Sequence, residues 1–162
     1  MKLFIDFLET KIGFLKIVAD KDHLREVNFF DHQDSDPLPN DLTHLTREQL
    51  TEYFKGSRKH FQLPLMPEGT AFQKRVWDKL LEIPYGKSAS YLEIARRLGD
   101  EKTIRAAASA NGKNPLAIII PCHRVIGADG SLTGYAGGLH RKKWLLRHEK
   151  HPLFINQQLE MF

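Results

Sequence analysis

The sequence contains little of what secreted, membrane-spanning or metal-binding proteins require. Its 162 residues include one cysteine, Cys122, which excludes an internal disulfide and a zinc site built from several thiolates. No apolar run approaches the roughly 20 residues that span a bilayer, and Asp6 lies where a signal peptide would be apolar. The histidines show no paired ligand spacing. We therefore expect a cytoplasmic protein that uses no metal or other cofactor and binds no membrane.

The composition supports a folded core, and the charge is unevenly distributed. Hydrophobic residues make up 41% of the chain, which argues against disorder. Residues 1–68 carry nine basic and twelve acidic side chains, whereas residues 69–162 carry fifteen basic and eight acidic ones. The net charge of +4 thus combines an acidic part with a basic part. The basic part favours binding to a polyanion, although a solvated basic surface has the same composition.

The first part of the chain predicts a small α+β domain over residues 1–66. Short apolar runs typical of an antiparallel meander lie at residues 3–8, 14–18 and 24–30. Residues 31–41 have no periodicity and predict a loop. Apolar residues then recur at helical spacing from Leu42 until Gly56, which is a typical stop signal. Two prolines at 64 and 67 indicate a linker.

The second part, residues 69–150, predicts a mainly helical domain, followed by a tail over residues 151–162. The helices are expected at residues 72–81, 91–98, 101–111 and 139–149. A tight turn at Gly99 joins the second helix to the third in a helix-turn-helix pattern. The apolar run Ala117–Ile120 predicts a buried strand. Asp129–Gly130 predicts the hairpin turn of a wing.

The third of these helices is unusual for a reader of the major groove. Its body, residues 105–111, is mostly alanine and offers few long side chains to base edges. Small residues let a helix approach a narrow minor groove closely. We expect Arg105 to reach into DNA, with Ala106 and Ala110 on the DNA-facing surface. Packing of the alanines against a neighbouring helix is the alternative.

Cys122 follows the apolar run and Pro121, and it precedes His123 and Arg124. A thiol in this position has a fixed backbone, and cationic neighbours lower the pKa of a thiol. The pattern therefore indicates a reactive cysteine. A Cys-His pair taken alone is more often incidental, so these residues leave both readings open.

The residues around Cys122 resemble the O6-alkylguanine-DNA alkyltransferases. The similarity runs from Gly69 to Glu149, and its most specific segments are Asn114-Pro115, Pro121–Val125, Gly134–Leu139 and Lys143–Leu146. The first domain resembles the family's ribonuclease-H-like domain in size and element order only. The resemblance implies an α+β protein in which this small domain precedes a winged helix-turn-helix-like alkyltransferase domain.

The resemblance implies direct-reversal DNA repair. The protein would flip O6-alkylguanine out of duplex DNA and transfer the alkyl group irreversibly to Cys122, once per molecule; activity on O4-alkylthymine stays open. His123 would accept the thiol proton through a water, and Glu149 would orient His123. Because Leu145 and Glu149 are four residues apart, Glu149 is expected on the inward face of the last helix.

The resemblance assigns further roles within the same reaction. Tyr91 would bond to guanine N3 and help to rotate the nucleotide, while Arg105 would fill the gap left in the base stack. Asn114 would order the turn that carries the cysteine, and Arg124 is assigned to DNA binding. The substrate pocket would be formed by Val125, Tyr135, Ala136 and Ala117, and alanine at 117, where some members have proline, suggests a roomier pocket.

Two further hypotheses concern partners. A non-catalytic minor-groove DNA-binding or regulatory protein that retains a thiol is the competing function. The C-terminal residues Gln158–Phe162 resemble short peptides that dock on the bacterial replication sliding clamp, with a tail that packs locally or dangles as the alternative. The expected partner is double-stranded DNA that carries O6-alkylguanine, bound by a monomer.

Overall fold

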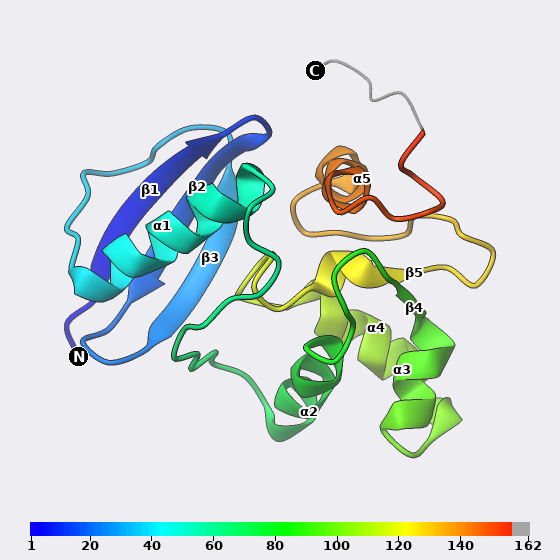
Figure 1. The fold of residues 1–162 in the computed structure, drawn as a ribbon. Helices are drawn as coiled ribbons and strands as arrows, with labels where there is room; N and C mark the ends of the chain where they lie inside the picture. The colour runs from blue at the N-terminus through cyan, green and yellow to red at the C-terminus, as the bar shows by residue number, and fades with distance from the viewer. Residues whose placement is uncertain (157–162) are drawn as a thin grey trace. The chain divides into compact units, whose positions relative to one another are not determined.

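The computed structural model describes residues 1–156, and its architecture is shown in Figure 1. The chain forms two compact units, one made of residues 1–68 with 115–119 and the other of residues 69–114 with the chain from residue 120 onward. Helices and small sheets occur in both, which confirms the predicted α+β class. No helix among residues 1–156 is long and apolar enough to cross a membrane.

The first unit is built on a three-stranded antiparallel sheet. Its strands are β1 (Phe4–Thr10), β2 (Gly13–Ala19) and β3 (Leu24–Phe30), and they lie in that order. The register places Phe7 opposite Lys16 and Leu15 opposite Phe29. All three strands were predicted from their apolar runs, and the structure confirms them.

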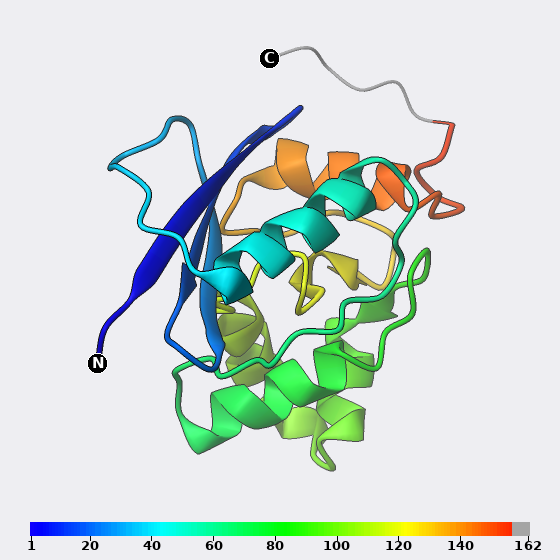
Figure 2. The same cartoon turned by 60° about the vertical axis from the view of Figure 1, so that its left-hand side comes forward.

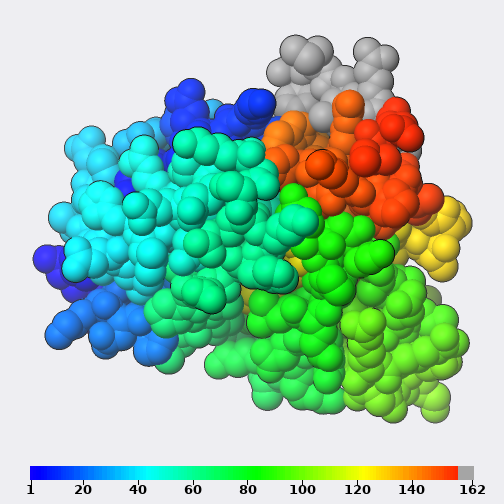
Figure 3. All heavy atoms as spheres, viewed as in Figure 1, coloured from blue at the N-terminus to red at the C-terminus, as the bar shows by residue number. Residues whose placement is uncertain are grey.

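One helix, α1 (Asp41–Phe54), covers a face of this sheet (Figures 1 and 2). It begins at a capping box in which Asn40 accepts a hydrogen bond from the backbone of Thr43 and the Thr43 side chain accepts one in return. Leu50 and Tyr53 are fully buried and lie one turn apart on the inward side. The opposite side of α1 lies at the surface (Figure 3).

The predicted strand Ala117–Ile120 does not form. Val27 of β3 donates to the carbonyl of Pro115 at 2.9 Å and accepts from the amide of Ala117 at 2.9 Å, so residues 115–117 extend the first unit. The backbone then reverses at Ile118, which has φ 70°, and the amide of Ile119 donates to the carbonyl of Ala117. This γ-turn-like reversal ends the extended segment. Residues 117–120 are buried, as expected. The only pairing with β3 in this segment is a single bridge between Val27 and Leu116.

The second unit is mainly helical, as predicted. Its elements are α2 (Ala71–Leu80), β4 (Ala89–Ser90), α3 (Tyr91–Arg97), a 3₁₀ turn at Glu101–Thr103, α4 (Ile104–Gly112), a 3₁₀ turn at Cys122–Arg124, β5 (Val125–Ile126) and α5 (Leu139–His148). A capping box at Ser90 and Glu93 starts α3, and Gly99 with φ 94° follows its end. The helix-turn-helix of α3 and α4 is thereby confirmed.

Helix α4 is held against α2 by one buried side chain. Trp77 of α2 is 2% exposed, and its indole Nε1 donates to the carbonyl of Ala110 at 2.9 Å. A buried indole N–H requires such a partner. This bond fixes the C-terminal half of α4 and, with it, the position of Asn111.

The predicted wing is not a hairpin of two strands. β5 pairs with β4 in parallel, with Ala89 opposite Val125. A tight turn does form at Asp129–Gly130, since the amide of Gly127 donates to the carbonyl of Ser131 at 2.8 Å. No strand follows that turn among residues 127–138. The Asp-Gly pair correctly predicted the turn. The hairpin does not form because β5, the strand before the turn, pairs with β4.

Candidate functional site

Cys122 sits at the start of a 3₁₀ turn and is 6% exposed. The amide of Cys122 donates to the carbonyl of Ile120 at 2.8 Å, which closes an inverse γ-turn around Pro121 (φ −81°, ψ 63°). The proline ring fixes φ in this range. The expected constraint on the backbone before the cysteine is therefore present.

His123 and Glu149 form a buried pair. Nε2 of His123 lies 2.7 Å from Oε2 of Glu149, and both side chains are fully buried. Since a carboxylate only accepts, the shared proton belongs to Nε2 and the lone pair to Nδ1. Nδ1 has no hydrogen-bond partner among residues 1–156. The expected inward position of Glu149, at the end of α5, is confirmed.

Arg124 completes this cluster. The sequence analysis assigned Arg124 to DNA binding, but its guanidinium is bonded within the protein. Its Nε donates to Oε1 of Glu149 at 2.8 Å and its Nη2 to Oε2 at 3.1 Å. The remaining Nη1 donates to the carbonyl of Ile83 at 2.7 Å, and Arg124 is 7% exposed. The guanidinium is thus committed to the buried carboxylate. A buried carboxylate needs a cationic partner, so the expected inward position of Glu149 could have indicated that Arg124 pairs with it.

These contacts set the charges of the cluster. Burial alone would raise the pKa of Glu149, but His123 and Arg124 outweigh burial and hold the pKa of Glu149 well below its usual range. Burial lowers the pKa of His123 in spite of the neighbouring carboxylate. The pair therefore consists of an anionic Glu149, neutralised by Arg124, and a neutral imidazole.

The thiol of Cys122 is not acidified, in contrast to the prediction. Burial raises the pKa of Cys122, while a hydrogen bond from Asn114 and the charge of Lys142 partly oppose this effect. The predicted cations do not contribute, because Arg124 is paired with Glu149 and His123 is neutral. The raised pKa favours a protonated thiol at rest.

The side chain of Asn114 contacts the turn that carries the cysteine, the turn that the resemblance predicted it would order. Its Nδ2 donates to the carbonyl of Ile120 at 2.8 Å, and the side chain also bonds to Cys122. The two contacts join the residue before the proline to the thiol itself.

A pocket of about 580 Å³ opens between α3, α4 and the loop after β5. It is lined by Tyr91, Ile104, Arg105, Ala108, Asn111, Gly112, Thr133, Gly134 and Tyr135. Of the predicted pocket residues, Tyr135 is among these. Val125 and Ala136 belong to the same unit but do not line the pocket, and Ala117 belongs to the first unit.

The loop on one side of the pocket is held by Tyr91 and by Lys142, a residue that the sequence analysis missed. The hydroxyl of Tyr91 donates to the carbonyl of Thr133 at 2.9 Å, and Nζ of Lys142 donates to the same oxygen at 3.0 Å and to that of Gly134 at 3.3 Å. Lys142 is fully buried, and burial lowers its pKa to about 8. Its spacing of three and seven residues from Leu145 and Glu149 could have placed it on the inward face.

The surface of α4 agrees with only part of the DNA-binding prediction. Arg105 and Ala106 are exposed. Ala110, in contrast, is 2% exposed and packs inward where its carbonyl accepts the Trp77 bond. The alternative of alanines packed against a neighbouring helix therefore holds for Ala110.

The fold and the site define a helix-turn-helix protein with a buried thiol, imidazole and carboxylate. The chain belongs to the 6-O-methylguanine DNA methyltransferase family. The model of the family's DNA binding domain matches residues 71–151, and that of its ribonuclease-like domain matches residues 3–67. This establishes the resemblance that the segments around Cys122 had indicated.

Relatives and solved structures agree with this membership. The chain is 44% identical to a methylated-DNA–protein-cysteine methyltransferase of Methanosarcina acetivorans over 91% of this chain and 98% of the relative. The crystal structure of the Mycobacterium tuberculosis O6-methylguanine methyltransferase is 40% identical, covers 92% of this chain and 93% of its own, and has a TM-score of 0.83. A structure of the M. tuberculosis protein OGT in complex with DNA is 42% identical. It covers 89% of this chain and 91% of its own, with a TM-score of 0.81.

Proposed function

We propose that this protein repairs alkylated DNA by direct reversal. It removes O6-alkylguanine from the duplex stack and takes the alkyl group onto Cys122, irreversibly and once per molecule. The observation that carries the proposal is the 2.7 Å contact between His123 and Glu149, which leaves Nδ1 of His123 as an unprotonated base in the residue that follows Cys122. Membership of the 6-O-methylguanine DNA methyltransferase family and the activity named for its relatives support the same reaction.

The chemical step uses the resting charges of the site. His123 takes the thiol proton at Nδ1, directly or through a water, and Glu149 stabilises the imidazolium that forms. The sulfur of Cys122 then attacks the alkyl carbon. A carbon–sulfur bond forms, the carbon–oxygen bond to O6 breaks, and the base leaves with the electron pair and gains a proton. Lys142 and Asn114 favour the thiolate against burial.

We propose that Tyr91 assists departure of the base by donating to guanine N3. In the described structure this hydroxyl bonds to Thr133, so it exchanges that carbonyl for the base when the pocket is filled. Tyr135 forms a pocket wall, and Val125 and Ala136 offer main-chain groups to the base. Ala117 is proposed to affect the size of the alkyl group that is accepted.

The DNA-facing surface is proposed to be the exposed side of α4. Arg105 lines the pocket and is exposed at the start of the helix, so it is placed to enter the stack when a base leaves it. Ala106 lets the helix approach the minor groove. Opening the stack costs a few kcal/mol, less at a damaged pair, which contributes selectivity.

The test is an intact-mass measurement after mixing the protein with duplex DNA that contains O6-methylguanine. We expect one added methylene equivalent on the peptide that contains Cys122, and none in Cys122→Ala. Unmodified DNA of the same sequence is the control. An unmodified protein that binds the damaged duplex tightly would favour the competing function, a DNA-binding or regulatory protein that retains its thiol. Action on O4-alkylthymine is tested with the corresponding duplex.

The functional domains are proposed as residues 1–66 and 69–150, with a tail over residues 151–162. Since one chain supplies one acceptor thiol, the active form is proposed to be a monomer. The predicted clamp-binding peptide, Gln158–Phe162, lies outside the described residues and stays a hypothesis. Calorimetry with a bacterial sliding clamp tests it. Binding that is lost in Leu159→Ala/Phe162→Ala supports it, and no binding by the intact protein contradicts it.

A further inference from the structure

The chain reverses direction immediately after Glu149, and a residue other than glycine makes the reversal. Lys150 has φ 59°, in the left-handed region that a Cβ disfavours. The amide of Lys150 donates to the carbonyl of Arg147 at 2.9 Å, and the amide of His151 donates to that of Leu146 at 3.0 Å, which are the two bonds of a Schellman motif. A lysine keeps this conformation where its surroundings hold it, so we looked for the contacts that fix the end of α5.

His151 supplies a contact of this kind and is 5% exposed. Its Nδ1 accepts a hydrogen bond from the amide of Leu153 at 3.1 Å. Because Nδ1 accepts, the proton of the neutral ring is on Nε2, which donates to Oγ of Ser88 at 2.8 Å. Burial lowers the pKa of His151 in spite of the nearby Glu149 carboxylate, which favours the neutral ring.

Ser88 ends the loop that contacts the carboxylate of Glu149. The amide of Gly86 donates to Oε1 of Glu149 at 3.4 Å, and a Cβ on Gly86 would lie 3.0 Å from the carbonyl oxygen of Glu149. At the start of the loop, the carbonyl of Ile83 accepts from Arg124 at 2.7 Å. The loop is therefore attached at both ends, by Arg124 at its start and by the bond to Ser88 at its end, with the contact to Glu149 in its middle.

We propose that His151 is a positioning residue for alkyl transfer, which holds the carboxylate of Glu149 against His123 by attaching the end of α5 to Ser88. The inference rests on the proposed function, and His151 acts through Glu149 and not on the reacting atoms. The 2.7 Å contact between His123 and Glu149 keeps the proton on Nε2 and leaves Nδ1 able to accept the thiol proton. If the end of α5 is released, a larger share of His123 carries its proton on Nδ1 and cannot act as the base.

The experiment removes the bond from each side in turn. Ser88→Ala removes the acceptor. In His151→Asn, the side-chain oxygen can still accept from the amide two residues further on, but no donor reaches Ser88. We expect each change to lower the limiting single-turnover rate on a duplex with O6-methylguanine by about fivefold to tenfold, the range of one neutral hydrogen bond. The DNA concentration that gives half of this rate should not change. The double variant should lose no more than either single variant, because both remove the same contact.

Three further measurements separate positioning from a general loss of stability. His151→Gln returns a side-chain N–H donor to the reach of Ser88 and should keep the rate within about twofold of the unaltered protein. Ile126→Val shortens a side chain in the apolar cluster of Phe154 and is the control, which should lower thermal stability and leave the rate unchanged. In ¹⁵N spectra of the histidine side chains, recorded without DNA, the Nδ1–H form of His123 should increase in Ser88→Ala and not in Ile126→Val.

The outcomes distinguish this proposal from the proposed function. Equal losses of rate in Ser88→Ala and Ile126→Val would overturn the role of His151, and so would additive losses in the double variant or an unchanged His123 tautomer. Thermal unfolding verifies that each variant folds, and His151→Asn carries the test if Ser88→Ala does not. If the unaltered protein transfers no alkyl group, the proposed function is contradicted, and the spectra alone decide whether the bond to Ser88 fixes the tautomer.

Discussion

Two parts of the chain bring together the same three kinds of side chain, a carboxylate, a histidine and an arginine. In the first unit, Asp6 of β1 lies 3.5 Å from Nη1 of Arg47 and 4.0 Å from Nδ1 of His44. In the second unit, Glu149 lies 2.8 Å from Nε of Arg124 and 2.7 Å from Nε2 of His123. The partners differ most in exposure, since 64% of the His44 side chain is exposed and none of the His123 side chain is.

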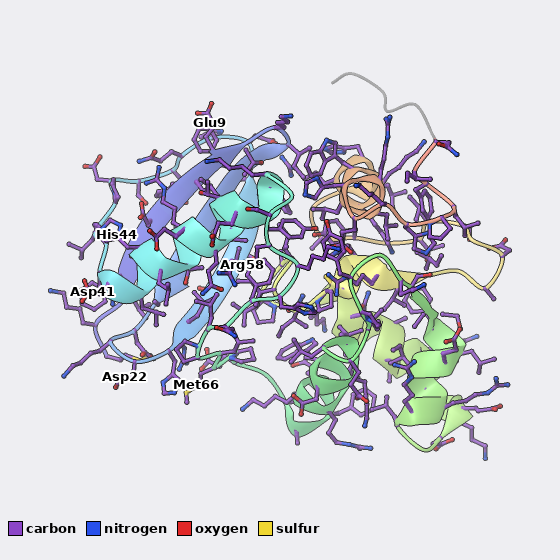
Figure 4. All side chains as sticks on the ribbon, in the orientation of Figure 1. Glu9, Asp22, Asp41, His44, Arg58 and Met66 are labelled. Carbon is purple, nitrogen blue, oxygen red and sulfur yellow. The ribbon has the colours of Figure 1, made fainter. Side chains whose placement is uncertain are left out.

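The difference shows that burial, more than residue type, gives the second cluster its chemistry. His44, which is labelled in Figure 4, and Arg47 are exposed side chains of α1, and water screens their attraction to Asp6. The second cluster is shielded from water, so its contacts fix the tautomer of His123 and the charge of Glu149. The same three kinds of group form weak, partly exposed contacts in one place and the proposed proton relay in the other.

The largest expected effect comes from removing one charge from each cluster by the same chemical change. In Glu149→Gln, an amide that donates to Nε2 shifts the proton of His123 to Nδ1 and removes the base. We expect the rate of alkyl transfer to fall by roughly 100- to 10,000-fold. In Asp6→Asn the rate should change by less than about twofold. Single-turnover kinetics measures both, and similar losses in the two variants would contradict the comparison.

The arginines provide the corresponding test of stability. Arg124→Met leaves Glu149 buried without its cation and should lower the free energy of unfolding by about 3–5 kcal/mol. Arg47→Met removes an exposed partner and should cost at most about 1 kcal/mol. Urea denaturation measures both values. A loss in Arg47→Met as large as that in Arg124→Met would show that exposure does not separate the clusters.

The pH dependence of stability should come from the buried cluster. The folded-state pKa values of Glu149 and His123 lie below the ordinary values of 4.5 and 6.5. As the pH falls through these ordinary values, the unfolded chain binds protons that the folded state excludes, so stability decreases. We expect a loss on the order of 2 kcal/mol between pH 7 and pH 4. Denaturation series at several pH values measure it, and Glu149→Gln should flatten the slope below pH 5.

The smallest expected effect concerns two glycines with similar backbones. Gly86 (φ 77°) and Gly56 (φ 83°) both adopt a conformation that costs an alanine about 1 kcal/mol. A Cβ on Gly86 would also lie 3.0 Å from the backbone carbonyl of Glu149, whereas nothing lies within 4 Å at Gly56. Gly86→Ala should therefore lower the unfolding free energy by roughly 1 kcal/mol more than Gly56→Ala. Equal losses would show that the turn at Gly86 does not hold Glu149.

Local signals in the sequence predicted most of the elements. The strands of the first unit and the inward position of Glu149 follow from patterns within a few residues. The predictions that failed depended on distant partners. The apolar run at 117–120 was expected as a strand, but its hydrogen bonds go to β3 only as far as Ala117.

The site shows the same division. The motif around Cys122 identified the family and predicted the nucleophile and its base. From the same motif we predicted that Arg124 binds DNA and that the pKa of the Cys122 thiol is lowered. Both predictions assumed that residues adjacent in sequence also act on one another in the folded protein. The folded chain brings Glu149 to Arg124 from the end of α5 and buries Lys142 beneath the pocket loop.

The sequence by itself therefore determined the one-thiol chemistry and the elements that surround it, because both are encoded by local residue types and spacing. Only the tertiary structure decided which charges meet and which are shielded from water. Burial depends on segments that are distant along the chain, and it is burial that leaves Cys122 protonated, His123 neutral and the Oδ1 of Asn111 without a partner among the described residues.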